Sequence, residues 1–441
     1  MHARSLLLSL SLVAAPVAAQ GVDTTITRTL GAAPERISLA EALARAPRVQ
    51  PTTVQAAGTV RNADAQRRSA TGAFLPNVSG SAGGARSFSE FASQLPNGEI
   101  GTAGTTNQTV NMGLSASLDL FTGFRRGADI KAADAQQRSA EAGLDNARFQ
   151  VALQTTQAFL DALATRQTVE VRIASVRRAQ EQLKVSVAKL RAGSATRSDS
   201  LRSEVNLGNA RIQLINAEIQ QATAEANLGR LVGATGRVEA VDDSAYYRHA
   251  AIDTTGLRAE ARAGAPQVRS SQASADAARA QIGATRAQYF PSLALTGNQS
   301  WSGNKNSDYQ LFQNRSLSLG LSWTLFNRFA RERNLVTSQV AADNAEATAA
   351  DAMRQVDAGI TQRFAELAAA QVRIGITQAS VQAATEDLRV VGERYRLGAA
   401  TIVDLLTSQE ALTQAEVDAV NARFDYLRAK AQVEALIGRS L

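Results

Sequence analysis

Two segments of the chain alternate strictly between apolar and polar residues. In the first, apolar side chains occupy every even position of 110–120, with Thr, Asn, Gly, Ser and Asp at the odd positions of 109–119. In the second, Leu and Trp occupy the odd positions of 317–325, with Ser, Gly and Thr between them. Period-two alternation predicts strands with one apolar and one polar face. A weaker alternation precedes each segment, so we expect two β-hairpins, at about 74–121 and 290–326.

Each predicted hairpin is followed by a very long helical pattern. Neither the segment from Phe124 to about Arg191 nor its counterpart ending at Leu397 contains a proline. A helix of about 70 residues would extend about 100 Å at 1.5 Å per residue. A return helix follows in each half, to about Val232 and Gly438. The return helices carry apolar residues at 3-4-3-4 spacing, which predicts coiled-coil seams, at Ile212, Ile215, Ile219, Ala222 and Ala226, and at Val417, Val420, Phe424, Leu427 and Ala431.

The chain reverses direction between these helices in two similar segments, Lys189–Leu201 and Arg394–Leu406. Each has a Gly, which ends a helix readily because it adopts left-handed dihedrals. A Thr three residues later and an Asp six residues later match the N-cap and N3 positions of a capping box. Each segment therefore predicts a tight helix–turn–helix tip. The residues concerned are Gly193, Thr196 and Asp199 in the first tip, and Gly398, Thr401 and Asp404 in the second.

The two halves are copies of one pattern. From Phe121 and Phe326 onwards they keep a constant offset of 205, without a gap for about 110 residues, which indicates an internal duplication. The first copy is longer within its hairpin, where an exposed loop tolerates insertions. We divide the chain into a signal peptide 1–19, a polar tail 20–36, a first repeat 37–232, a linker 233–256 and a second repeat 257–441.

The N-terminus indicates export. Arg4, an apolar run and the small residues Val17, Ala18 and Ala19 are typical of a secretory signal peptide cut after Ala19. No other stretch is long and apolar enough for a transmembrane helix. Any insertion into a membrane would therefore use β-strands. After the tail, a helix capped by Ser38 is expected to run to about Gly72, with bends at prolines on the way.

Composition argues against most catalytic chemistry. The 441-residue chain has no cysteine, which excludes disulfides, thiolate metal sites and a cysteine nucleophile. It has two histidines, His2 and His249, so we expect no metal, no cofactor, no catalytic site and no enzymatic activity. The net charge is +7, and the basic residues are scattered among Asp and Glu along helix faces. This pattern indicates solvated helix surfaces rather than nucleic-acid binding.

Four amphipathic strands per chain are too few to close a barrel in lipid, because bacterial barrels begin at about eight strands. We therefore expect a mainly α fold with a membrane β-part: long antiparallel coiled-coil helices, and four strands contributed to a trimeric twelve-strand β-barrel. Trp301 and Trp323 lie near opposite ends of the second hairpin, as two interfacial girdles would require. The alternative, strands packed on a soluble core, does not explain helices too long for a compact domain.

The sequence resembles the TolC family of outer-membrane efflux and secretion channels. The match is carried by the strand entries Phe74-Leu75-Pro76 and Tyr289-Phe290-Pro291, the Leu-Phe strand exits, and the segment from Tyr395 to Leu406. The resemblance implies a homotrimer whose barrel lies in the outer membrane. A twelve-helix tunnel would continue the barrel across the periplasm and narrow at the helix tips. Such a passive duct would dock a periplasmic adaptor protein and an inner-membrane pump, and would contact outer-membrane lipid.

The resemblance also assigns residues. Asp404 and Asp199 match the acidic entrance ring, Tyr395 matches a tyrosine that latches the closed entrance, and Gly193 and Gly398 match the turns that engage the adaptor. The N-caps Thr196 and Thr401 belong to the same tips. The chain departs from the family at Ala400, where an Arg is expected, and at Thr407, where a second acidic residue is expected. Candidate substitutes for the missing latch arginine are Arg396, Arg191 and Arg197.

The expected function is a passive outer-membrane exit duct for small molecules, as part of a tripartite efflux or type I secretion system. One alternative is a duct for secreted proteins. An alternative of another class is an exported coiled-coil structural protein without a pore.

Overall fold

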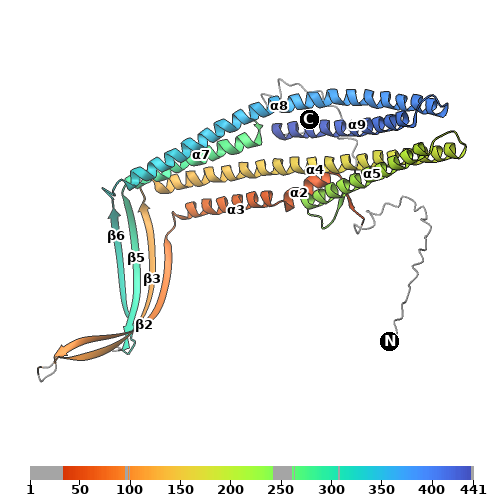
Figure 1. Ribbon diagram of the computed structural model, residues 1–441. Helices are drawn as coiled ribbons and strands as arrows, with labels where there is room; N and C mark the ends of the chain where they lie inside the picture. The colour runs from red at the N-terminus through yellow and green to blue at the C-terminus, as the bar shows by residue number, and fades with distance from the viewer. Residues whose placement is uncertain are drawn as a thin grey trace, which may run out of the picture.

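The computed structural model describes residues 33–94, 98, 100–241, 261–262, 264–305 and 308–438. A bundle of long helices extends from one end of a four-stranded sheet, and the tips of two helical hairpins lie at the far end (Figure 1). The predicted signal peptide and most of the predicted linker lie outside the described residues. No helix within the described part is both long enough and apolar enough to cross a membrane.

The helices of the two halves have matching bounds. α4 spans Arg125–Arg191 and α8 spans Ala330–Arg396, and each has 67 residues. α5 spans Arg197–Val232 and α9 spans Ile402–Ile437, and each has 36 residues. The first and last residues of α8 and α9 each lie 205 positions after those of α4 and α5. The shorter helices are α2 (Leu39–Val49), α3 (Pro51–Gly72), α7 (Pro266–Arg286) and the 3-10 turn η2 (Ala287–Tyr289).

The first helical segment is divided rather than merely bent. Ser38 caps α2, and its Oγ accepts the Glu41 N–H at 3.3 Å. Pro47 lies inside α2, whereas Pro51 begins the separate helix α3. Gln50 between them is extended, as expected of a residue that precedes a proline.

The main sheet is antiparallel, in the order β2-β3-β5-β6. Its strands are β2 (Asn77–Gln94), β3 (Ile100–Phe121), β5 (Ser292–Asn304) and β6 (Phe312–Ser322). The first hairpin is the longer one, as predicted. Leu118 pairs with Leu295, which pairs with Leu319, so the apolar positions share one face of the sheet.

The second hairpin differs from the prediction at its end. β6 stops at Ser322, so Trp323 and Leu325 lie beyond the strand rather than within it. The Trp323 indole N–H donates to the Tyr289 carbonyl oxygen at 3.3 Å. Arg331 donates to the carbonyl oxygens of Thr324 and Leu325 at 2.8 and 3.0 Å. These side chains take backbone acceptors that would otherwise continue the ladder.

Two short strands were not predicted. β1 (Glu35–Ile37) and β4 (Val238–Ala240) form a parallel two-stranded sheet, in segments interpreted as tail and linker. Three residues are too few for a period-two signal. Ile37 and Val238 are buried in the main hydrophobic core, together with Phe159 and Leu160 of α4. The two strands and α2 therefore add a layer against the middle of α4.

The two predicted seams differ in the structure. Phe424, Leu427 and Ala431 of α9 are buried, as predicted. In α5 the prediction was wrong for a single chain, because Ile212, Ile215 and Ile219 are 56%, 45% and 51% exposed. α9 packs against both α8 and α4, whereas α5 lies at the flank of the bundle and contacts mainly α4. The residues that bury α5 against α4 are Leu207, Leu214 and Ala217.

Candidate functional site at the helix tips

Both helix tips turn through a left-handed glycine. Gly193 has φ +74° and Gly398 has φ +78°. The following N–H closes each turn, from Ser194 to the Lys189 oxygen at 2.9 Å and from Ala399 to the Arg394 oxygen at 2.7 Å. Such backbone bonds satisfy carbonyl groups that the helix end leaves without partners. The predicted turn role of both glycines is confirmed.

Both predicted capping boxes are present. Thr196 Oγ1 accepts the Asp199 N–H at 3.2 Å, and Asp199 Oδ2 accepts the Thr196 N–H at 3.0 Å. The corresponding bonds between Thr401 and Asp404 are 3.2 and 2.9 Å. Hydrogen bonds from the Thr401 backbone and hydroxyl, and the nearby Arg394 charge, lower the pKa of the Asp404 carboxyl. Asp404 is exposed, so the second tip presents a carboxylate held in a fixed orientation at neutral pH.

Tyr395 links the two hairpins through a lysine. Its ring is 7% exposed and packs against Ile402 and Leu405. Lys189, at the end of α4, donates its ammonium to the Tyr395 carbonyl oxygen at 2.7 Å. The same ammonium lies 4.0 Å from the centroid of the Tyr395 ring. The Tyr395 hydroxyl is buried without a hydrogen-bond partner among the described residues, so the ring and the backbone make this contact.

Among the described residues, none of the three arginines considered as latch substitutes donates a hydrogen bond to Tyr395; Lys189 does so. Arg396 pairs with Glu393 of its own helix at 3.3 Å. Arg191 and Arg197 are exposed. Sequence reasoning missed Lys189 because the contact joins residues 206 positions apart. The duplication could have directed attention to this end of α4, because Lys189 is equivalent to Arg394, the neighbour of Tyr395.

A second link between the hairpins lies farther from the tips. Arg178 of α4 makes a bidentate ion pair with Glu416 of α9, at 3.2 and 2.8 Å. Its guanidinium also donates to Thr413 Oγ1 at 3.1 Å. Both charged side chains are about one quarter exposed. A bidentate, partly buried pair is the kind of ion pair that contributes measurably to stability. The two hairpins are therefore joined at two levels.

The junction between the sheet and the helical bundle carries an aromatic cluster (Figure 1). Phe124 stacks edge-on against Phe121 and Phe290, with ring centroids 5.2 and 5.6 Å apart. Trp323 is 59% exposed at this end of the sheet, and Trp301 lies in β5 near the other end, paired with Gln313. The girdle role of the two tryptophans stays a prediction.

The described residues contain no group of three or more His, Asp or Glu side chains that could hold a metal ion. Among the charged side chains at the tips, Asp199 and Asp404 cap helices and Lys189 joins the two hairpins. The arrangement is therefore suited to presenting fixed charges and to holding helices together.

Comparison with known proteins identifies the family. The family model described as outer membrane efflux protein matches residues 39–234 and 257–439. BepC, an outer membrane efflux protein of Brucella suis, is 24% identical over 384 residues, which cover 85% of this chain and 81% of BepC. AprF, an alkaline protease secretion protein of Pseudomonas aeruginosa, is 24% identical over 68% of this chain and 64% of AprF.

The fold matches solved structures. The CmeC outer membrane channel of Campylobacter jejuni superposes with a TM-score of 0.77 at 18% identity, over 91% of this chain and 85% of CmeC. The superposition with CmeC covers 91% of this chain, and so extends over both the sheet at one end and the long helical hairpins at the other. The chain thus belongs to the outer membrane efflux protein family, with a TolC-like fold and a location in the outer membrane.

Proposed function

We propose that the protein is the outer-membrane exit duct of a tripartite efflux system, which three copies of the chain form together. The observation that carries the proposal is the sheet: β2 and β6 are its outer strands, and each has one edge that no described strand pairs. In lipid, unpaired backbone groups have no water to bind, so a sheet must close on itself or on other chains. Three copies would close a twelve-strand barrel, which continues into a tunnel of long helices.

The tips would form the periplasmic entrance. Asp199 and Asp404 stand in equivalent capping boxes, and threefold symmetry would bring six carboxylates into one mouth. Such a ring attracts cations and repels anions. The contacts of Lys189 with Tyr395 and of Arg178 with Glu416 would hold the two hairpins of each chain together. The entrance would open when the hairpins separate, driven by an adaptor and a pump docked near Gly193 and Gly398.

Small molecules are the proposed cargo. BepC is called an efflux protein and covers most of this chain, which supports this choice. AprF is called a protease secretion protein, which makes export of proteins the second candidate. The two candidates differ in the phenotype of a deletion strain. Efflux predicts increased sensitivity to toxic compounds with an unchanged set of secreted proteins, and restoration of resistance by the unaltered gene. Loss of one secreted protein with unchanged sensitivity would favour the second candidate.

The entrance role is tested by substituting Asp404→Asn in protein reconstituted in planar bilayers. Asparagine retains an oxygen that accepts the Thr401 N–H, so the turn is preserved while three charges leave the entrance. We expect cation selectivity to fall. Glu386→Gln on the same hairpin removes a charge that Arg389 already pairs at 2.7 Å, and serves as the control. Equal selectivity of the Asp404→Asn variant and the unaltered protein would remove Asp404 from the entrance.

A further inference from the structure

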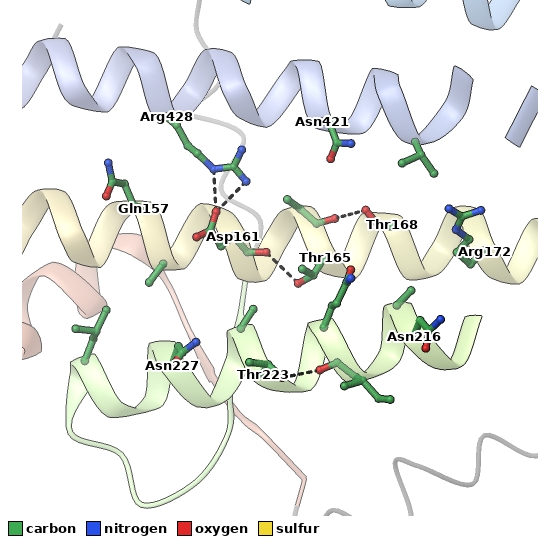
Figure 2. Close-up of a pocket in the computed structure, with 18 of the residues that line it drawn as sticks. Gln157, Asp161, Thr165, Thr168, Arg172, Asn216, Thr223, Asn227, Asn421 and Arg428 are labelled. Atoms are coloured by element: carbon green, nitrogen blue, oxygen red, sulfur yellow. Dashed lines mark hydrogen bonds and ion pairs between the residues drawn. The ribbon is translucent and has the colours of Figure 1, made fainter. Parts of the chain in front are cut away.

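A polar groove of about 720 Å³ crosses the middle of the helical bundle, between α4, α5 and α9. Figure 2 shows amide and hydroxyl side chains from the three helices around it. These include Gln157, Thr165 and Thr168 on α4, Asn216, Thr223 and Asn227 on α5, and Asn421 on α9. The threonine hydroxyls donate to carbonyl oxygens of their own helices, so the amide side chains are the groups that offer hydrogen-bond donors to a solute.

The groove also carries an excess of positive charge. Its lining contains three arginines and one aspartate. Asp161 is paired with Arg428 at 2.8 Å (Figure 2), and Arg428 also pairs with Asp425 at 2.8 Å. The guanidinium groups of Arg172 and Arg230 have no ion-pair partner in the part of the chain that the structure describes. Two guanidinium groups per chain are therefore available to an anion.

The groove lies on the face of α4 opposite the added layer of α2, β1 and β4. Phe159, Leu160 and Leu163 of α4 belong to the same hydrophobic core as Ile37 and Val238 of that layer, whereas Gln157, Asp161 and Thr165 line the groove. At about 100° per residue these two sets lie on opposite sides of the helix. An extra layer inside a tunnel of helices would block it, so the layer belongs outside and the groove faces the tunnel axis.

We propose that this groove is a binding subsite in the tunnel wall for anionic solutes that carry several hydrogen-bonding groups, such as polycarboxylates. The inference rests on the proposed function, because only an assembled duct places the groove on a passage. Guanidinium groups bind carboxylates and phosphates through paired, charge-assisted hydrogen bonds. Three copies would set six unpaired guanidinium groups around the tunnel, and a field of one sign raises the local concentration of counter-ions.

The groove and the tips act as separate zones. Along α5, Asn216 and Arg230 lie about 25 and 45 Å from Asp199 at 1.5 Å per residue. The Debye length is about 8 Å at physiological ionic strength, so the acidic tips do not cancel the positive groove. Cargo would pass a negative mouth and then a positive zone. The effects of substitutions in the two zones should therefore be independent of each other.

The test compares two double variants that remove the same charge. Arg172→Gln with Arg230→Gln neutralises the groove. Arg177→Gln with Arg211→Gln is the matched control, because both arginines are exposed and lie on the faces of α4 and α5 away from the groove. The measurements, in planar bilayers, are the chloride-to-potassium permeability ratio under a salt gradient and the block of current by added citrate.

For the groove variant we expect the chloride-to-potassium ratio to fall about two- to threefold at low salt and the citrate block to weaken. The control should match the unaltered protein. The inference is overturned if the groove variant keeps both properties, or if the control changes as much as the groove variant does. A protein that forms no conducting pore even after Lys189, which contacts Tyr395 at the tips, is replaced by methionine would overturn the proposed function itself.

Discussion

Replacing Lys189 with methionine should favour the open entrance. The ammonium donates to the Tyr395 carbonyl oxygen at 2.7 Å and lies 4.0 Å from its ring. A hydrogen bond from a charged group contributes about 1.5–3 kcal/mol and a partly exposed cation–π contact about 0.5–1 kcal/mol. Lys189 is half-buried, and water solvates its ammonium group once the contact is broken. We therefore take the contribution of this contact to the closed state as about 1–2 kcal/mol per chain. Methionine keeps most of the apolar stem.

The effect is multiplied if the three chains open together. A loss of about 3–6 kcal/mol per trimer corresponds to a change of about 100- to 10,000-fold in the ratio of open to closed entrances. The assay is open probability in single-channel recordings from planar bilayers. Lys184→Met is the control, because Lys184 is exposed and its ion pair within the described residues is with Glu181 of its own helix, at 2.7 Å. Unchanged open probability of Lys189→Met would refute the assignment of this contact to closure.

Three further predictions concern the tips. Gly398→Ala should lower the free energy of unfolding by about 1–2 kcal/mol, because alanine is strained at φ +78°. Gly392→Ala within α8 is the control and should raise the free energy of unfolding by up to about 1 kcal/mol. Equal shifts of the two variants in chemical denaturation would contradict this prediction. Tyr395→Phe should leave open probability unchanged and not destabilise the fold, since the lost hydroxyl is buried without a partner. Cation selectivity due to Asp404 should persist as pH falls through the usual aspartate range, because the folded pKa of this carboxyl is lowered. Its contribution to stability is fully present above the unfolded pKa and is lost progressively as pH falls from there through the folded pKa.

The elements with a repeated local signal were predictable. Capping boxes at Thr196 and Thr401 set the starts of α5 and α9, and both structural caps match the prediction. The absence of proline over nearly 70 residues indicated α4 and α8. Alternation located the two hairpins of the sheet. The start of β3 at Ile100 was not recognised, because the first half of this strand is rich in Gly, Thr and Asn and does not alternate clearly.

Contacts between distant segments were not predictable. The Lys189–Tyr395 contact and the Arg178–Glu416 pair join α4 to the second hairpin, and no local pattern indicates that these residues meet. β1 and β4 are stabilised by tertiary burial of Ile37 and Val238 rather than by local periodicity. The apolar seam of α5 has the spacing of a coiled coil, but no helix of the described chain covers it. The sequence could not show this, because periodicity does not say which helix will cover an apolar face.

The most direct test of the central claim is the conductance of detergent-extracted protein whose oligomeric mass is known. The account predicts a trimer that requires detergent for extraction and gives stable conductance in a planar bilayer, with the Lys189→Met variant open more often. A monomer that is released by salt or urea without detergent, and that does not conduct even with Lys189 replaced, would contradict it. The long helices would then belong to an exported structural protein without a pore.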